Sequence, residues 1–174
     1  ECLVGSEMCI RDRWYRKHFK LSESDKGKVI YIDFDGVYRN SRVWLNGHLL
    51  GFRPNGYVSF RYDLTPYLNY GKEENVLVVQ ADNSDQPNSR WYSGSGIYRN
   101  VWLVKTGQVH VDNWGTNITT PVMNADKSTV EIETTLKNEA SDVTVEVSTL
   151  IQDKEGKTLY RLSLIHISEP TRHS

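Results

Sequence analysis

The residues best suited to chemistry lie in one short stretch, which reads NSRWYSGSGIYRNV from position 88 to position 101. Arg90 supplies a forked set of N–H donors, and Trp91 beside it supplies a planar aromatic ring. A sugar offers the matching surfaces, which are an apolar C–H face and a rim of hydroxyls. Gly94 and Gly96 allow the backbone a positive φ or a close approach to a ligand. The stretch therefore predicts a sugar-binding loop, although a Trp beside a Tyr at the start of a strand is also consistent with burial in a core.

Alternation of apolar and polar residues predicts that a β-sandwich carries this loop. The segment 28–35 alternates with the period of a half-buried strand. Asn46-Gly47 is a strong two-residue turn signal and predicts a hairpin over 43–52. The apolar run 76–82 predicts a central strand that is covered on both faces. Further strands are predicted at 14–21, 58–64 and 97–105.

Two other segments complete the expected organisation. Residues 63–68 predict a single helical turn that Thr65 caps, with Pro66 in the first helical position. Beyond Gly107 the strand pattern restarts, and short strands at regular spacing are typical of an immunoglobulin-like sandwich. These strands are predicted at 109–114, 129–136, 143–151 and 158–160, separated by polar turns.

A series of motifs in a fixed order carries a family resemblance. The motifs are WYRK at 14–17, FDGV at 34–37, VWLNG at 43–47, GY at 56–57, DLT at 63–65 and RWYSGSGIYRNVWL at 90–103. Together they resemble the N-terminal sugar-binding domain of glycoside hydrolase family 2, the family of β-galactosidases and β-glucuronidases. The resemblance implies an all-β fold, in which a galactose-binding-like jelly-roll sandwich is followed by a truncated immunoglobulin-like β-sandwich.

Both ends of the chain resemble translated sequencing-adapter DNA, and we set them aside as one sets aside expression tags. The expected domains are then a jelly-roll sugar-binding domain without its first strands and a partial immunoglobulin-like sandwich. Cys2 and Cys9 lie in the first end segment, so the cysteine count carries no information on disulfides or redox compartment. The four segments are 1–13 (adapter), 14–105 (jelly roll), 106–161 (partial sandwich) and 162–174 (adapter).

The resemblance also implies what this chain contributes to catalysis. Members of the family are retaining glycosidases, in which one Glu protonates the leaving oxygen and another attacks the anomeric carbon. Both belong to a barrel that would follow residue 161, so we expect no catalytic residue here and no turnover by this chain alone. The N-terminal domain supplies a loop that walls the substrate pocket and grips the sugar, which corresponds to residues 82–96. The candidate substrate-binding residues are Arg90, Trp91, Asn88 and Asp85.

No metal or cofactor is predicted. Some family members carry an acidic residue, which can help to hold a cation, where this sequence has Arg90, so we carry over no metal site and leave the identity of the sugar open. His18, His48 and His110 have no spacing typical of metal ligands. Asp33 and Asp35 share one face of a strand, but nothing in the sequence supplies the separate surroundings that an acid and a base require.

Charge and hydropathy exclude some partners and leave others. The net charge of −1 gives no bias toward nucleic acid or anionic membranes, and no apolar run approaches transmembrane length. The expected partners are a carbohydrate, such as a terminal β-galactoside, and the C-terminal barrel of the same protein. A homo-oligomer of the complete parent protein is compatible with the family resemblance. The family favours a periplasmic or extracellular location, with no signal peptide observable. The alternatives are a stand-alone carbohydrate-binding or adhesion module, and a structural loop in which Arg90 and Trp91 are buried.

Overall fold

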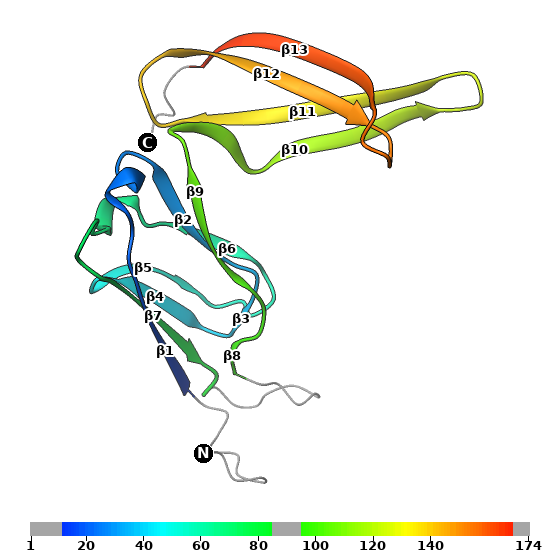
Figure 1. Ribbon diagram of the computed structural model, residues 1–174. Coiled ribbons are helices and arrows are strands. Elements are labelled where there is room, and N and C mark those ends of the chain that lie inside the picture. The colour runs from blue at the N-terminus through cyan, green and yellow to red at the C-terminus, as the bar shows by residue number, and fades with distance from the viewer. Residues whose placement is uncertain (1–11, 85–94, 169–174) are drawn as a thin grey trace. The chain divides into compact units, whose positions relative to one another are not determined.

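The computed structural model describes residues 12–84 and 95–168. The chain divides after Thr106 into two units, and each is described by itself. All regular elements of the described residues are β-strands apart from two short 3₁₀ turns (Figure 1). The expectation of an all-β fold is therefore confirmed. Within this part of the chain, no helix is long and apolar enough to span a membrane.

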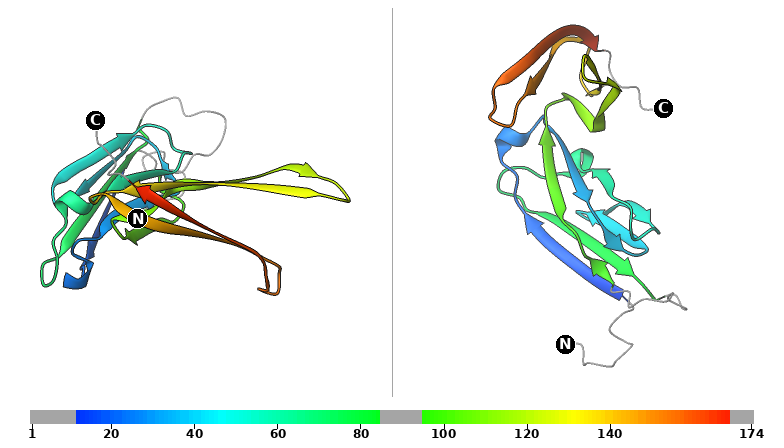
Figure 2. Two further views of the ribbon diagram at one scale, coloured as in Figure 1. Left: turned by 90° about the horizontal axis from the view of Figure 1, so that it is seen from above. Right: turned by 90° about the vertical axis from the view of Figure 1, so that its right-hand side faces the viewer.

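Two antiparallel sheets form the layers of the first unit (Figures 1 and 2). The larger sheet has the order β1-β7-β4-β5 and the smaller one the order β6-β2-β9. The larger sheet contains β1 (Asp12–Phe19), β7 (Asn75–Asp82), β4 (Ser41–Leu45) and β5 (His48–Arg53). The smaller sheet contains β6 (Phe60–Asp63), β2 (Val29–Phe34) and β9 (Val101–Thr106). A third, two-stranded sheet consists of β3 (Val37–Tyr38) and β8 (Gly96–Ile97).

The core of this unit lies between the two sheets, because each contributes alternate apolar side chains to it. Phe34 of β2 and Phe60 of β6 stack with ring centroids 4.9 Å apart. The buried core residues are Leu21, Ile30, Ile32, Phe34, Val37, Val43, Leu45, Phe60, Leu64, Leu77, Val79 and Ala81. In β7, burial alternates strictly, so this strand is central as predicted but its outer face is only half covered.

The predicted hairpin at Asn46-Gly47 is confirmed. Asn46 has φ 49° and Gly47 has φ 87°, which are the left-handed conformations that a tight two-residue turn requires. The Asn46 side chain also links the turn to β7, since its Oδ1 accepts from the Val76 N–H at 2.8 Å and its Nδ2 donates to Asn75 Oδ1 at 2.9 Å. The turn is therefore fixed by tertiary contacts as well as by its own backbone preference.

The predicted helical turn is present as η3 (Thr65–Tyr67), but its predicted cap is wrong. Leu64 occupies the N-cap position and makes no side-chain cap. The Thr65 hydroxyl instead accepts a hydrogen bond from the Ile30 N–H at 3.0 Å. The Asp63 carboxylate, instead of the Thr65 hydroxyl, bonds to the backbone at the start of the turn and accepts from the Thr65 N–H at 2.9 Å. A tertiary hydrogen bond to β2 has outcompeted the local cap.

A second 3₁₀ turn, η2 (Glu23–Asp25), lies where the sequence predicts a polar loop. Asp25 is buried and pairs with Lys28 Nζ at 2.9 Å and Lys105 Nζ at 2.5 Å. Hydrogen bonds from Lys105 and then Lys28 lower the pKa of Asp25 to about 2. This carboxylate ties η2 to β9 at one end of the sandwich.

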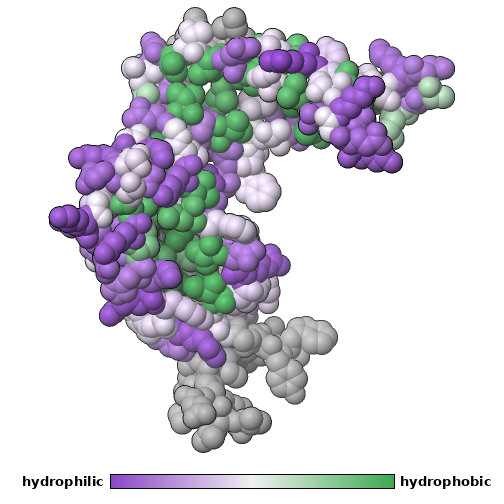
Figure 3. Space-filling view, in the orientation of Figure 1, coloured by the Kyte–Doolittle hydropathy of each residue, from purple (hydrophilic) through white to green (hydrophobic). Residues whose placement is uncertain are grey.

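One side of the sandwich is open between β1 and β9. Among the described strands, β1 pairs only with β7 and β9 pairs only with β2, so each has one unpaired edge. Between these edges lies an apolar groove of about 530 Å³. Val101 and Leu103 line the groove and remain exposed although they lie on the core side of β9. Apolar side chains gather on the visible surface of this unit in Figure 3.

The second unit consists of two hairpins rather than a closed sandwich. They are β10 (Val109–Met123) with β11 (Ser128–Asn138), and β12 (Val143–Gln152) with β13 (Thr158–Ser168) (Figure 2). The strands are longer than the sequence predicts, and β10 is irregular at Trp114, whose φ is 56°. Apolar side chains of β11, β12 and β13 line a cavity of about 410 Å³.

Candidate functional site

The predicted substrate-binding residues Asp85, Asn88, Arg90 and Trp91 lie outside the described residues. Their placement stays a prediction. The structure does describe the residues on either side of the loop, up to Ser84 and from Ser95 onward. The site is therefore built from the strands that hold the loop and from the side chains around its base.

The two ends of the loop are anchored at neighbouring places. The Ser95 hydroxyl donates to the Ala81 carbonyl at 3.4 Å, which joins the returning chain to the end of β7. The N–H of Asp82 donates to the Arg39 carbonyl at 2.9 Å. Hydrogen bonds from Ser84, and then the charges of nearby arginines, hold the pKa of Asp82 below its usual range. The loop thus starts and ends on a fixed, hydrogen-bonded base.

The pairing of β3 with β8 fixes the returning strand and explains Gly96. Tyr38 pairs with Gly96 in this short ladder. Gly96 has φ 122°, and a Cβ added there would lie 2.1 Å from the Tyr15 hydroxyl oxygen. That oxygen accepts a hydrogen bond from the Ile97 N–H at 3.3 Å. Only glycine fits between these two contacts, as the sequence predicts for a position of close backbone approach.

Three tyrosines gather beside β3 and β8. The rings of Tyr38 and Tyr57 meet edge to face with centroids 5.4 Å apart, and the Tyr98 hydroxyl donates to the Gly56 carbonyl at 2.8 Å. Hydrogen bonding to the Tyr38 side chain raises the pKa of Tyr57. Tyr57 is 69% exposed, so its ring is held from one side and open to solvent. Such a ring is suited to stacking against an apolar ligand face.

The residue that follows β7, Asn83, carries a fully buried side-chain amide. Asn83 has no exposed surface, and neither its Nδ2 nor its Oδ1 has a hydrogen-bond partner within residues 12–84 and 95–168. Buried side-chain amides are normally paired, because desolvating them without a partner is costly. Among the described residues, the hydrogen-bonding atoms of the Asn83 amide at the base of the loop are therefore unused.

The sequence did not single out this tyrosine cluster, although a signal was present. A Cβ at Gly56 would lie 2.3 Å from the Tyr38 ring, and one at Gly36 would lie 2.6 Å from the Tyr98 ring. Each of these glycines thus marks a place where a tyrosine ring packs directly against the backbone. Without the fold, however, nothing in the spacing assigned a given glycine to a given ring.

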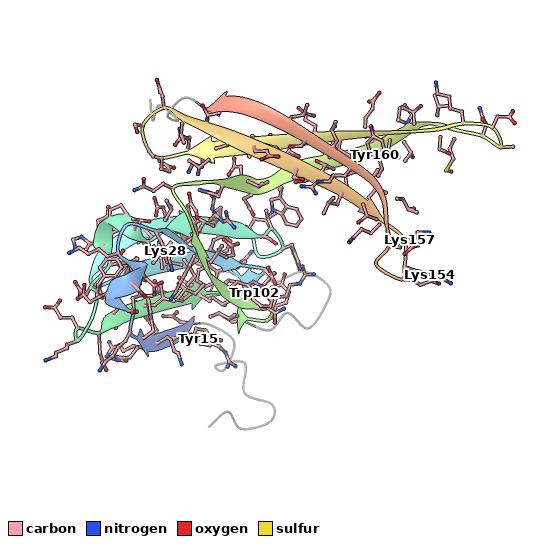
Figure 4. All side chains as sticks on the ribbon, turned by 45° about the horizontal axis from the view of Figure 1, so that its top comes forward. Tyr15, Lys28, Trp102, Lys154, Lys157 and Tyr160 are labelled. Carbon is pink, nitrogen blue, oxygen red and sulfur yellow. The ribbon has the colours of Figure 1, made fainter. Side chains whose placement is uncertain are left out.

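The two aspartates considered as an acid and base pair have structural partners. Arg61 binds both carboxylate oxygens of Asp33, each at 2.6 Å, and the Trp102 indole N–H donates to Asp35 at 3.0 Å (Trp102 is labelled in Figure 4). In the described part of the chain, no three acidic, His or Cys side chains come together as a metal site.

Two antiparallel sheets, with the tyrosine cluster beside β3 and β8, define a β-sandwich domain. Residues 8–107 match the model of the glycosyl hydrolases family 2 sugar binding domain. The chain belongs to this family and carries that domain.

Relatives and solved structures agree with this assignment. A β-galactosidase of Bacteroides ovatus is 54% identical over 145 residues, which are 83% of this chain and 17% of that protein. A β-glucuronidase of Formosa agariphila is 34% identical over 82% of this chain and 17% of its own length. The crystal structure of a glycosyl hydrolase family 2 member from Bacteroides cellulosilyticus is similar with a TM-score of 0.87 and 38% identity, over 91% of this chain and 22% of that one. The chain thus spans about one fifth of the length of these proteins.

Proposed function

We propose that this chain is the N-terminal part of a retaining glycoside hydrolase of the β-galactosidase or β-glucuronidase type. The parent protein hydrolyses terminal β-glycosidic bonds, with its two catalytic carboxyls on a barrel outside this chain. The first unit forms a wall of the substrate pocket through the loop 82–96, in which Arg90 donates to sugar hydroxyls and Trp91 packs against the ring. Asn88 and Asp85 are further contacts to the sugar.

One observation carries the proposal: a family sugar-binding domain holds the loop on a rigid base next to an exposed aromatic ring. The anchors are the Ser95 bond to Ala81 and the β3–β8 ladder. A loop with both ends fixed positions its donors at little entropic cost, which favours binding that is specific to one geometry. Tyr57 adds an exposed aromatic ring that packs against Tyr38 of this base.

The test is steady-state kinetics of the complete parent enzyme with nitrophenyl β-galactoside and nitrophenyl β-glucuronide. Arg90→Ala should lower kcat/KM by about a hundredfold, because a hydrogen-bonded charged contact is lost, and Tyr57→Ala by about tenfold. The matched control is Tyr67→Ala, since Tyr67 of η3 is also exposed and its ring stacks on that of His48 of β5.

The melting temperature of each variant separates this role from a structural one. We expect Arg90→Ala to leave the melting temperature nearly unchanged. A large loss of stability with normal kinetics would mean that Arg90 and Trp91 are core residues and that the loop is not part of the pocket.

A further inference from the structure

The outer face of the larger sheet carries a row of side chains that the proposed pocket does not use. In the register of the sheet, Trp14 of β1 lies opposite Gln80 of β7, Gln80 opposite Arg42 of β4, and Arg42 opposite Phe52 of β5. The row therefore crosses all four strands on the side away from the core. We call these four residues the outer row.

An aromatic platform forms one end of the outer row. Trp14 stacks on Trp44 of β4 with ring centroids 5.6 Å apart and an angle of 19° between the planes. The Trp14 indole N–H donates at 3.0 Å to Asp12, a residue of the adapter-like end segment, so only the stacking on Trp44 is counted toward the platform. Trp14 is nevertheless 59% exposed. One face of the Trp14 ring is thus covered by Trp44 while much of the residue remains exposed to solvent, which presents the ring for binding at little entropic cost.

Polar groups with weak internal bonds border this platform. Arg42 Nη1 donates to Gln80 Oε1 at 3.5 Å, and Gln80 Nε2 donates to Asp12 Oδ2 at 3.5 Å. Both distances are at the long limit for such bonds, so a hydroxyl at a shorter distance competes well with them. The Arg42 guanidinium lies 4.9 Å from the centroid of the Phe52 ring, which supports its charged end.

The outer row continues from the base of the loop. Asp82 lies two residues beyond Gln80 on the same face of β7, which corresponds to about 7 Å along the strand. The charge of Arg42 contributes to the lowered pKa of Asp82. The outer row and the base of the predicted loop therefore lie on the same strand, β7.

We propose that the outer row is a second carbohydrate-binding surface, which holds an extended β-linked oligosaccharide. A flat ring bordered by hydrogen-bond donors and acceptors matches the C–H face and the hydroxyl rim of such a chain. The inference uses residues other than those of the proposed pocket and goes beyond the proposed function.

The test titrates the 174-residue chain with cellotetraose, xylotetraose and β-1,4-galactotetraose, and with the matching monosaccharides. The indole N–H resonances are followed by NMR. We expect at least one tetrasaccharide to shift the Trp14 resonance and to bind more tightly than its monosaccharide. Trp14→Ala should weaken this binding about tenfold, as expected for the loss of one stacked ring. Trp14→Phe, which keeps a ring, should recover part of the affinity.

Trp102→Ala is the matched control. Trp102 is 54% exposed and also donates its indole N–H to an aspartate, but it lies on β9 of the other sheet. Its substitution should change the affinity less than about twofold. If Trp14→Ala lowers the melting temperature, Arg42→Gln provides a test that leaves both tryptophans in place, with an expected loss of about threefold.

Three results would overturn the proposal. The first is the absence of any shift of Trp14 with all three tetrasaccharides. The second is an equal loss of affinity in the Trp14 and Trp102 variants. The third is a shift of Trp14 that depends on protein concentration instead of sugar, together with self-association in sedimentation that Trp14→Ala abolishes; that result would make the outer row a contact between protein surfaces. A failure of this kind leaves the kinetic test of Arg90 unaffected, so the two proposals are judged separately.

Discussion

The hydroxyl oxygen of Tyr15 accepts a hydrogen bond from the Ile97 backbone N–H at 3.3 Å, across 82 positions of sequence. It thereby joins β1 to the strand that receives the chain from the predicted sugar-binding loop. The contact leaves no room for a side chain at Gly96, where an added Cβ would lie 2.1 Å from the same oxygen. The geometry of the loop base thus depends on one glycine and one tyrosine.

Gly96→Ala should lower the free energy of unfolding by about 3 kcal/mol, because it adds both a strained positive φ and a steric overlap. Urea denaturation of the chain measures this change. Gly107→Ala is the control, since the nearest atom to a Cβ there is 3.4 Å away, and it should cost less than about 1 kcal/mol. Equal effects of the two substitutions would contradict the role given to Gly96.

Asp25 should make the stability of the first unit depend on acid pH. Its folded-state pKa of about 2 lies below the ordinary value of 3.8, so the unfolded chain takes up the proton first as pH falls. The stabilisation is fully present above about pH 4 and is lost as pH falls from there through about pH 2. Asp25→Asn should therefore be less stable than the unchanged chain at pH 6, and the difference should shrink between pH 4 and pH 2. A difference that does not vary with pH would mean that the two lysine contacts do not favour the ionised form.

Asn75 should be a large contributor to the stability of the hairpin end. Its buried side chain accepts from the Asn69 N–H at 2.8 Å and from Asn46, and it donates to the Asn69 carbonyl at 2.8 Å. Asn75→Ala should cost about 3 kcal/mol in thermal or urea unfolding, because it leaves several buried groups unpaired. Asn113→Ala serves as an exposed control and should be nearly neutral. A small effect at Asn75 would show that water replaces these hydrogen bonds.

The groove between β1 and β9 should bind apolar dyes and promote self-association. Its unpaired strand edges and exposed core-side residues are the features that lead β proteins to aggregate. Leu103→Lys should lower anilinonaphthalene sulfonate fluorescence severalfold, whereas Trp102→Lys, on the other face of β9, should not. We propose that strands of the parent protein fill this groove, so restoring them should also remove the dye signal. Dye binding that persists in the Leu103 variant would place the apolar surface elsewhere, for example in the cavity of the second unit.

Sequence patterns alone located most of the strands of this protein. Period-two alternation located β2 and β12, and Asn46-Gly47 located the β4–β5 hairpin, because these signals act between neighbouring residues. The ordered motifs also pointed to the correct family. Local signals carry this information because strand period and turn conformation are short-range properties of the chain.

Only the tertiary structure decided which distant residues meet. Thr65 bonds to Ile30 instead of capping its own turn, and Tyr57 reaches Tyr38, because long-range contacts outcompete local ones once the sheets pack. The stacking of Trp14 on Trp44 likewise requires the strand order β1-β7-β4, in which both flank β7. Alternation places a side chain on a face but does not select the neighbouring strand, and that choice is made by burial of the common core.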